Sequence, residues 1–530
     1  MKKLRFNISV VVLSTIALTF SACAEKDAAE EKKTDKNNGT TTTFISGNDE
    51  TASAKTRTSL DYATEKWFWE AGDKIYVKDR DGNWQVSNAV TAHTENFTFK
   101  LPGMYSPTGT MVYYLGKNGT NNQITIPTTQ NQTNPNAIDE ISNNGECGVA
   151  EAVPQWKADG LAFKFKLKHQ AAILVLQPYT TSTVLHNCKL TKIEIISDND
   201  IAGTFTLSSL GLTGAGSKSI TVNTKSIASG SSFLQGFPLT NNAANLATNG
   251  VYTVIKPGTH ALKVRYWVKD LFNGVEGKIA ISYPAFNYTA NGYYDLTAPL
   301  TVKEFDDKYY MWGAQKDYWW GHESDRPAPG NPGENYPQSK AQDPLRWHDE
   351  LGGNGVPHEA QSTPFQDCPN VNEALWYLLE GDAQFVTNGL FAMNGHLQSM
   401  PGIWIKKKKR IMKDHGITDP NYLKNGYPSI GGVYTDWRTQ SMISPLTPKA
   451  MFRTLQLSDP DDAGNYFFLP ALDRYYTGTM YGYMQIGCYW TSSANVSSDS
   501  SFSFVFSAYG PSMQLSMTDR RSGNKAVNFE

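Results

Sequence analysis

The chain contains little cysteine for its length, with five residues among 530. Cys23 lies near the N-terminus, and Cys147, Cys188, Cys368 and Cys488 are spread widely over the remainder. No two of them have the spacing of a zinc site. Four cysteines allow three pairings, and free buried thiols explain so low a count as well as disulfides do. The cysteine content therefore predicts no metal site and leaves the pairing open.

Net charge and the common catalytic motifs are also lacking. The chain carries 48 basic and 50 acidic side chains, so no overall field attracts nucleic acid, and we expect no such partner. It has no HExxH, GxSxG, GxGxxG or phosphate-binding glycine loop. Asp459, Asp461 and Asp462 lie close together, but without the spacing of a calcium-binding EF-hand, and a solvated turn is the simpler interpretation. The sequence predicts neither an enzyme nor a cofactor.

The apolar run at residues 8–20 is too short to span a bilayer as a helix. Lys2, Lys3 and Arg5 precede it and Ser21-Ala22-Cys23 follows, which is the pattern of a secretory signal. A cysteine directly after the small pair resembles a bacterial lipoprotein signal over residues 1–22. That resemblance implies lipid attachment at Cys23 and anchoring in the outer membrane. The alternative is a plain secretory signal with a chance cysteine.

What the sequence has in abundance is the pattern of β-strands. Glycine is frequent, helical segments are few, and the length predicts two to four domains. Alternation at residues 74–78 and 163–168 predicts half-buried strands, and residues 79–82 form a hairpin turn between strands. Continuous apolar runs at residues 111–115 and 171–176 predict strands buried on both faces.

Residues 57–77 begin with RTSLD, continue with the aromatic cluster Trp67-Phe68-Trp69 and end with GDKIYV, which has the pattern of a strand. This segment, and the passage FKFKLKHQAAILVLQ that begins at Phe163, resemble the fimbrillin-like lipoproteins of Bacteroidetes, the subunits of cell-surface pili. The resemblance implies two tandem transthyretin-like β-sandwich domains, at residues 57–180 and 181–305, and other fimbrillin subunits as partners. His169 within the passage is interpreted as a core or edge histidine.

The resemblance also implies a removable strand. In fimbrillins the first strand of the precursor is cut off after a basic residue, and the vacated groove accepts a strand from the next subunit. Residues 40–46, within the otherwise charged tether of residues 23–56, would be that strand, and Arg57 or Lys55 the processing site. The alternative is that these are ordinary linker residues.

Residues 306–344 are rich in aromatic residues and then in proline, which predicts an extended spacer whose tandem tryptophans dock on the next domain. Residues 345–530 follow. Asn370 and Glu373 form a capping box for a helix that ends at Gly381, and Thr447-Pro448 opens a second helix. The basic run at residues 405–410 is interpreted as a solvated edge or loop.

The motifs YFFLPAL, YWTSS and FSFVF near the end of the chain resemble C-type-lectin-like or formylglycine-enzyme-like modules. Formylglycine-generating activity needs paired cysteines, and Cys488 has no close partner in the sequence. The lectin calcium signatures are missing as well. The resemblance therefore implies only the fold: mainly β, with two tandem sandwiches followed by an α+β C-type-lectin-like domain.

A chain that closes with a whole domain, instead of a strand to donate, resembles a tip subunit: a fimbrial adhesin that contacts host or bacterial ligands, glycan or protein, at the cell surface. Exposed aromatic side chains stack on sugars or anchor protein partners. The ligand-contact residues we expect are Asp473, Tyr475, Tyr476, Tyr481, Tyr483 and Trp490. For Trp490 a core position is the favoured interpretation, and the four tyrosines are the stronger candidates. The alternative function is a surface glycan-binding lipoprotein that never polymerises.

Overall fold

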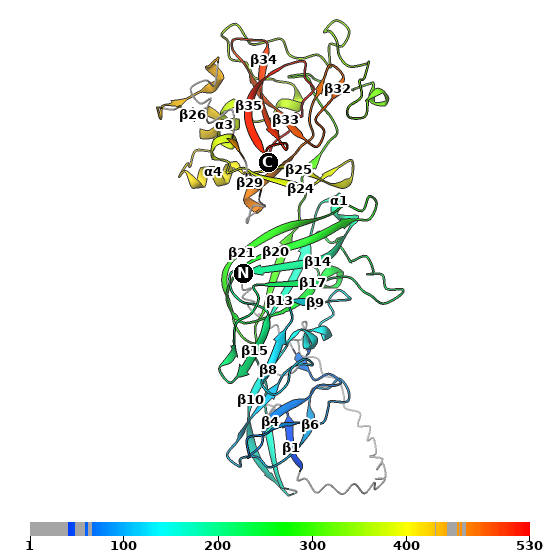
Figure 1. Ribbon diagram of the computed structural model, residues 1–530, viewed down its shortest axis with the longest axis vertical. Helices are drawn as coiled ribbons and strands as arrows, with labels where there is room; N and C mark the ends of the chain where they lie inside the picture. Colours follow the sequence, from blue (N-terminus) through cyan, green and yellow to red (C-terminus); the bar gives the residue numbers. More distant parts are fainter. Residues whose placement is uncertain are drawn as a thin grey trace, which may run out of the picture.

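The computed structural model describes residues 41–47, 59–61, 66–158, 160–429, 431–441, 453–454, 456–457 and 463–530. The described chain is mainly β and forms three bodies stacked along the long axis of the molecule (Figure 1). None of its helices has the length and apolar character needed to span a membrane. Cys23, Lys55, Arg57, the helix expected at Thr447-Pro448 and the acidic loop at residues 459–462 lie outside the described residues.

The N-terminal body is built on one sheet and a buried aromatic core. Along the sheet the strands are β5 (Trp84–Val86), β4 (Ile75–Lys78), β7 (Thr110–Tyr114), β10 (Gly148–Lys157), β11 (Gly160–Phe165), β1 (Thr41–Ser46) and β6 (Phe97–Pro102), and β12 (Lys168–His169) pairs with β10. A separate ribbon joins β2 (Ser59–Asp61) to β3 (Lys66–Phe68). The predicted alternation in β4 is confirmed, because Ile75 and Val77 are buried and Lys78 is exposed.

The hairpin turn between β4 and β5 is also confirmed. Asp79 Oδ1 accepts hydrogen bonds from the backbone N–H groups of Asp81 (3.0 Å) and Asn83 (2.9 Å), and Gly82 adopts a positive φ of 85°. The prediction for residues 111–115 is wrong in one respect. Val112 and Tyr114 are buried, but Met111 and Tyr113 are only half-buried, because β7 has the main core of the N-terminal body on one side only.

The middle body packs several sheets around one large core. One sheet contains β19 (Val251–Ile255), β13 (Ala172–Tyr179) and β22 (Tyr293–Pro299). A second sheet contains β21 (Glu276–Tyr288), β20 (Gly258–Asp270), β14 (Cys188–Ser197), β17 (Ser219–Asn223) and β9 (Thr129–Asn131), and β18 (Phe237–Pro238) pairs with β14. A third sheet contains β16 (Gly211–Thr213), β15 (Gly203–Ser208) and β8 (Gln123–Ile126). Short helices η1 (Asp139–Asn144), α1 (Thr183–His186) and α2 (Leu246–Asn249) complete it.

The packing does not divide at residues 180 and 181, where the sequence analysis places the boundary. Strands β8 and β9 precede that point, yet they pair with β15 and β17 of the middle body. Strand β13 also precedes it, and its buried side chains belong to the middle core. A continuous apolar strand needs cover on both faces, and only the interior of the middle body provides that.

His169 is a core histidine, as predicted. Its side chain is buried, and Nδ1 lies 2.5 Å from Oε1 of Glu146, which is buried too. The cysteines outside the N-terminal segment are all buried, and no disulfide joins them in the described chain. Burial raises the pKa of the Cys368 and Cys488 thiols to about 12, which keeps them protonated and unreactive.

The C-terminal body combines two sheets with short helices. One sheet contains β23 (Glu304–Phe305), β24 (Gln384–Met393), β25 (His396–Lys406), β30 (Tyr466–Pro470) and β29 (Gln456–Leu457), and the other contains β28 (Arg453–Thr454), β35 (Ser512–Asp519), β34 (Ser500–Ser507) and β33 (Ile486–Ala494). Small ribbons pair β26 (Tyr427–Pro428) with β27 (Tyr434–Thr435), and β31 (Tyr475–Tyr476) with β32 (Thr479–Met480). The helical segments are η2 (Glu323–Asp325), η3 (Thr363–Phe365), α3 (Val371–Glu380), α4 (Lys408–Asp414), α5 (Tyr422–Asn425), η4 (Trp437–Thr439) and η6 (Ala463–Asn465).

The helix predicted from the capping box is α3. The Asn370 side chain accepts from the Glu373 N–H at 3.0 Å, and the Glu373 carboxylate accepts from the Asn370 N–H at 3.1 Å. The basic run at residues 405–410 does not form a loop, because it ends β25 and begins α4. Lys408 pairs with Glu373 of the capping box, so part of the run is structural.

Residues 306–344 are part of the C-terminal body and not a free spacer. Trp312 and Trp319 are fully buried, but Trp320, the second of the tandem tryptophans, is 44% exposed, so the predicted docking holds for only one of that pair. Trp312 Nε1 donates to the Thr491 carbonyl oxygen at 3.0 Å, and the Tyr310 N–H donates to the Asn524 carbonyl oxygen at 2.8 Å. The proline-rich segment stays irregular, but its aromatic side chains supply core that the short strands of this body cannot supply alone.

The middle and C-terminal bodies meet through the turn after β20. Asp270 Oδ2 accepts from the Leu397 N–H at 3.1 Å and lies 3.0 Å from His396 Nδ1. Phe272 stacks on the His396 ring with centroids 4.1 Å apart, and Asn273 Nδ2 donates to the Leu397 carbonyl oxygen at 2.8 Å. Burial alone would raise the pKa of Asp270, but the hydrogen bonds that it accepts from the Phe272 N–H, the Leu397 N–H and His396 hold that pKa below its usual value. The contact fixes the two bodies against each other.

Candidate functional sites

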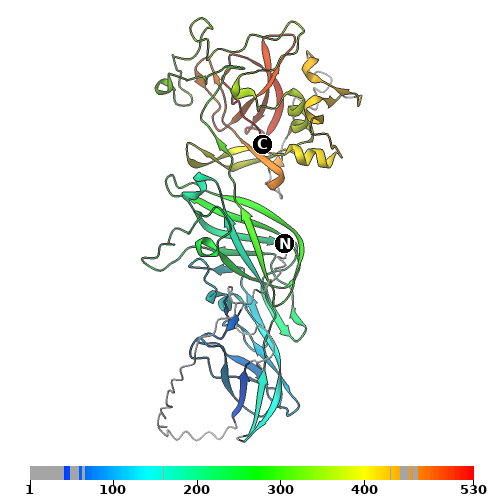
Figure 2. The same cartoon turned by 180° about the vertical axis from the view of Figure 1, so that it is seen from behind.

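Strand β1 lies inside the N-terminal sheet, between β11 and β6. It runs parallel to β11, with Phe44 opposite Phe163, and antiparallel to β6 along its whole length. Both views place it at the end of the molecule farthest from the C-terminal body (Figures 1 and 2). Its removal would therefore expose two facing strand edges, and such edges are templates for another strand.

The side chains of β1 complete the core of this sheet. Phe44 is fully buried, with its ring 4.8 Å from Phe163 and 5.0 Å from Tyr105 between centroids. Two positions on, Ser46 Oγ accepts from Trp69 Nε1 at 2.9 Å and from the Phe97 N–H at 3.0 Å. Burial of alternate residues specifies the register, since a slip of one residue would turn Phe44 away from its pocket.

The covalent order of the chain sets β1 apart from the rest of the sheet. Lys55 and Arg57, the predicted processing residues, follow β1 and precede β2 in the sequence. A cut after either one would leave β1 attached to its sheet by hydrogen bonds and packing alone. Tyr105, which forms a wall of the Phe44 pocket, could not be predicted from the sequence, because no periodic pattern surrounds it.

Three of the six ligand-contact candidates lie inside the C-terminal body. Trp490 is fully buried and donates from Nε1 to the Tyr310 carbonyl oxygen at 2.7 Å. Tyr475 is buried and stacks on Tyr318 with centroids 5.5 Å apart. Asp473 is buried, accepts the Gly482 N–H, and has a pKa that burial raises above its usual value. Residues 309–319 cover Trp490 and Tyr475, and Asp473 is engaged by the backbone of residues 482–486.

The other three candidates leave a smaller contact surface. Tyr481 and Tyr476 are exposed, at 73% and 48% of their surface, and Tyr483 is partly buried against the core. Tyr476 belongs to the β31–β32 ribbon, and Tyr481 follows that ribbon directly. No cluster of three His, Cys, Asp or Glu side chains that could hold a metal ion occurs in the described chain.

Comparison with known proteins gives structural neighbours only. No protein-family model and no curated protein matches the chain. A candidate cell adhesion protein from Bacteroides ovatus is similar at 12% identity, with a TM-score of 0.28 over 48% of this chain and 91% of that chain. The fimbrial anchor protein Mfa2 from Porphyromonas gingivalis has 12% identity and a TM-score of 0.23, over 48% of this chain and 90% of that one. A fimbrial protein from Bacteroides ovatus has 10% identity and a TM-score of 0.23, over 56% of each chain.

Proposed function

We propose that the chain is a cell-surface fimbrial subunit that another subunit joins by replacing strand β1. The precursor is anchored in the outer membrane through a lipid on Cys23, and cleavage after Lys55 or Arg57 frees β1 from the rest of the chain. The observation that carries the proposal is the position of β1. It is an internal strand with a buried Phe44, yet it precedes both basic residues in the sequence.

A replacement strand would restore the interactions that β1 leaves behind. Main-chain hydrogen bonds to β6 and β11 would supply affinity, and a large apolar side chain would refill the Phe44 pocket. Burying a side chain of that size contributes about 1.5–3 kcal/mol. A hydroxyl two positions on would again accept from Trp69 Nε1. These requirements predict an alternating donor strand, with an aromatic or long aliphatic residue opposite Phe163.

The C-terminal body supports a place at the tip of the fimbrium. Residues 520–529 are packed into this domain, since Arg520, Lys525 and Phe529 are buried. Lys525 Nζ donates to the carbonyl oxygens of Asp306 (2.6 Å) and Lys308 (2.7 Å). This segment could not be donated to a neighbour without disrupting the domain. The exposed Tyr476 and Tyr481 are then the side chains that we assign to ligand contact.

The alternative is a surface glycan-binding lipoprotein that stays monomeric. The observation that favours it is that β1 already fills its own sheet, so the described chain needs no partner for a complete fold. The two functions differ in whether β1 leaves after processing.

Limited trypsin digestion of the purified full-length precursor separates these functions. Mass spectrometry and size analysis should show loss of the residues up to Arg57, followed by association with other fimbrial subunits. The double variant Lys55→Ala/Arg57→Ala, treated in the same way, should keep β1 and stay monomeric. A precursor that remains uncut and monomeric but binds to a glycan array would instead establish the alternative.

A further inference from the structure

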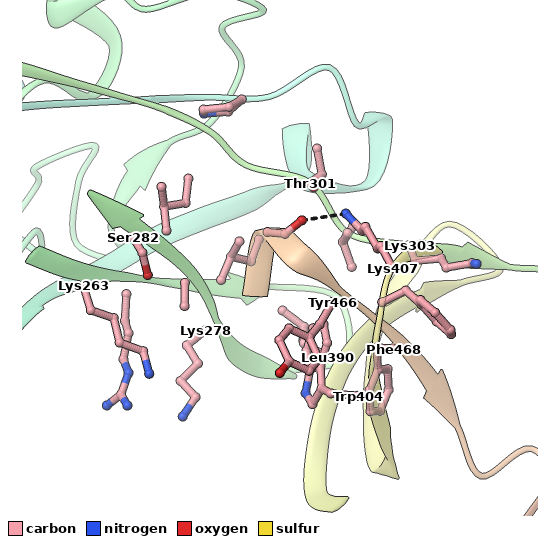
Figure 3. A pocket seen from close by; sticks show the side chains of 18 of the residues that line it. Lys263, Lys278, Ser282, Thr301, Lys303, Leu390, Trp404, Lys407, Tyr466 and Phe468 are labelled. Carbon is pink, nitrogen blue, oxygen red and sulfur yellow. Dashed lines mark hydrogen bonds between the residues drawn. The ribbon is translucent and has the colours of Figure 1, made fainter. Parts of the chain in front are cut away.

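The cavity between the middle and C-terminal bodies has a volume of about 570 Å³ and is lined by basic and aromatic side chains (Figure 3). Its cations are engaged within the chain. Arg265 Nη1 lies 3.8 Å from a carboxylate oxygen of Glu194. Lys303 Nζ donates to the Asn528 carbonyl oxygen at 2.6 Å. An aromatic side chain that does lack cover lies in the N-terminal sheet, two strands away from β1.

This side chain is Trp156, which is 76% exposed although it lies on the core face of its sheet. It stands directly opposite Leu161 in the β10–β11 pair, and residues directly opposite each other share a face. Leu161 in turn shares a face with Phe163, two positions on, which is fully buried. The indole therefore faces the core side of the sheet without being covered there. The β10–β11 hairpin, cyan in Figure 1, ends at the same end of the molecule as β1 (Figures 1 and 2).

Strand β1 fits this end of the sheet least well. Thr42 shares the inward face of β1 with Phe44, but it is only half-buried. It lies opposite Leu101, a fully buried residue of β6. The pairing of β1 with β11 begins at Thr43, and continuing the same register would place the half-buried Leu161 beside Thr42. A short polar side chain therefore occupies a position whose neighbours on both strands are leucines.

A longer apolar side chain at the position of Thr42 would reach the uncovered apolar surface of β10 and β11. Neighbouring strands lie about 4.8 Å apart, so Trp156 is about 9.6 Å across the sheet, with Leu161 between. Thr42 Oγ1 donates to the Gly103 carbonyl oxygen at 2.9 Å, and this bond would be lost. A net hydrogen bond is worth about two- to tenfold in affinity, whereas burial of a large apolar side chain is worth about ten- to a hundredfold. The burial therefore outweighs the lost hydrogen bond.

We propose that the strand of the incoming subunit carries a large apolar side chain at the position of Thr42, where it packs against Leu161 and the indole of Trp156. The inference rests on the proposed function, in which that strand takes the place of β1. An incoming strand displaces β1 readily only if it binds more tightly, and it can gain most where β1 fits least well. Trp156 is thereby a specificity-determining residue. It selects strands with a large apolar residue two positions before the one that fills the Phe44 pocket.

Competition between two peptides tests this position. The full chain is cut at a specific protease site placed between β1 and β2. It is then mixed with equal amounts of a peptide that contains TTTFIS and of its Thr42→Leu variant, each with a different isotope label. Native mass spectrometry should show about tenfold more of the Thr42→Leu peptide bound. The matched control peptide is Thr43→Leu, which adds the same side chain on the other face of the strand and should bind about as well as TTTFIS.

Protein variants test the wall of the pocket. In Trp156→Ala the preference for the Thr42→Leu peptide should fall to about threefold or less. Val153→Ala, at an exposed position on the other face of β10, should leave the preference unchanged. In the uncut chain, Thr42→Leu should slow amide exchange in β6 and β11 about tenfold, and Trp156→Ala should remove that gain.

The outcomes separate this inference from the proposed function. Equal binding of the two peptides, an equal gain from Thr43→Leu, or an unchanged preference in Trp156→Ala overturns the inference and leaves the proposed function intact. If neither peptide enters the cut chain, the proposed function is wrong and the inference falls with it. Unchanged amide exchange in the uncut Thr42→Leu variant would show that a leucine finds no apolar contact at this position, which also overturns the inference.

Discussion

At one end of the molecule a sheet is completed by β1, which precedes Lys55 and Arg57 in the sequence. At the other end residues 520–529 pack into their own domain, with Arg520, Lys525 and Phe529 buried. Both segments fill an apolar space. They differ in covalent connection and in the number of buried polar contacts. Strand β1 contributes one buried aromatic side chain and main-chain hydrogen bonds to its two neighbouring strands, and another strand can reproduce both. Residues 520–530 insert two buried cations and a phenylalanine, which no generic strand would supply.

The largest effect is expected in the C-terminal body. Trp490→Ala should lower its free energy of unfolding by about 4–5 kcal/mol, because it empties a large core volume. It also leaves the buried Tyr310 carbonyl oxygen without its donor. Trp320→Ala, at a half-exposed position, should change the free energy of unfolding by less than about 1 kcal/mol. Chemical denaturation followed by hydrogen exchange of β33 and β34 measures both; equal effects would show that Trp490 is not a core residue.

Phe44→Ala should destabilise the N-terminal sheet by about 3 kcal/mol, because it leaves a cavity against Phe163 and Tyr105. Exchange of the backbone amides in β6 and β11 should accelerate, while exchange in β33 should not change. Thr43→Ala, on the other face of β1, is the control and should have a much smaller effect. If Phe44→Ala left β6 and β11 fully protected, β1 would not be the strand that holds this sheet closed.

A smaller effect is expected in the pH dependence of stability that Lys303 produces, near the contact between the middle and C-terminal bodies. Burial lowers the pKa of Lys303 to about 8, although the Glu530 charge opposes the shift. Below pH 8 the amine is charged in both the folded and unfolded states. Between pH 8 and its unfolded value near 10.5 the unfolded state binds more protons, so this group makes stability rise with pH. The free energy of unfolding of the wild type, minus that of Lys303→Met, should therefore increase over this range; a flat or falling difference would contradict the shift.

The smallest change in stability is expected at the exposed aromatic surface. Tyr481→Ala should alter the free energy of unfolding by less than about 0.5 kcal/mol, since the side chain is largely solvated. It should nevertheless reduce adhesion of fimbriated cells to their target. Tyr509→Ala, at another exposed tyrosine, is the matched control and should leave adhesion unchanged. Equal adhesion by the Tyr481→Ala variant and the wild type would remove this surface from the proposed function.

The features that the sequence predicted correctly depend on neighbours along the chain. Alternation identified β4 and the last residues of β11, although β11 ends at Phe165 and not at Lys168 as expected. The capping box of Asn370 and Glu373 identified α3. Each signal arises within a few residues, so a pattern of that length carries it.

The features that the sequence could not predict depend on partners far away in the chain. Strand β8 pairs with β15 about eighty residues later, so the expected domain boundary could not be found from local composition. Tyr475 was expected to contact a ligand because its cover, Tyr309 and Tyr318, comes from more than 150 positions earlier in the chain.

The exchange of β1 is the central claim, and peptide replacement tests it directly. A specific protease site is placed between β1 and β2, the full chain is cut, and an isotope-labelled peptide that contains TTTFIS is added in excess. Native mass spectrometry should show that the labelled peptide takes the place of the original segment, while a peptide with Phe44→Asp does not. The account is contradicted if the cut, folded protein never exchanges its segment, or if both peptides enter equally well.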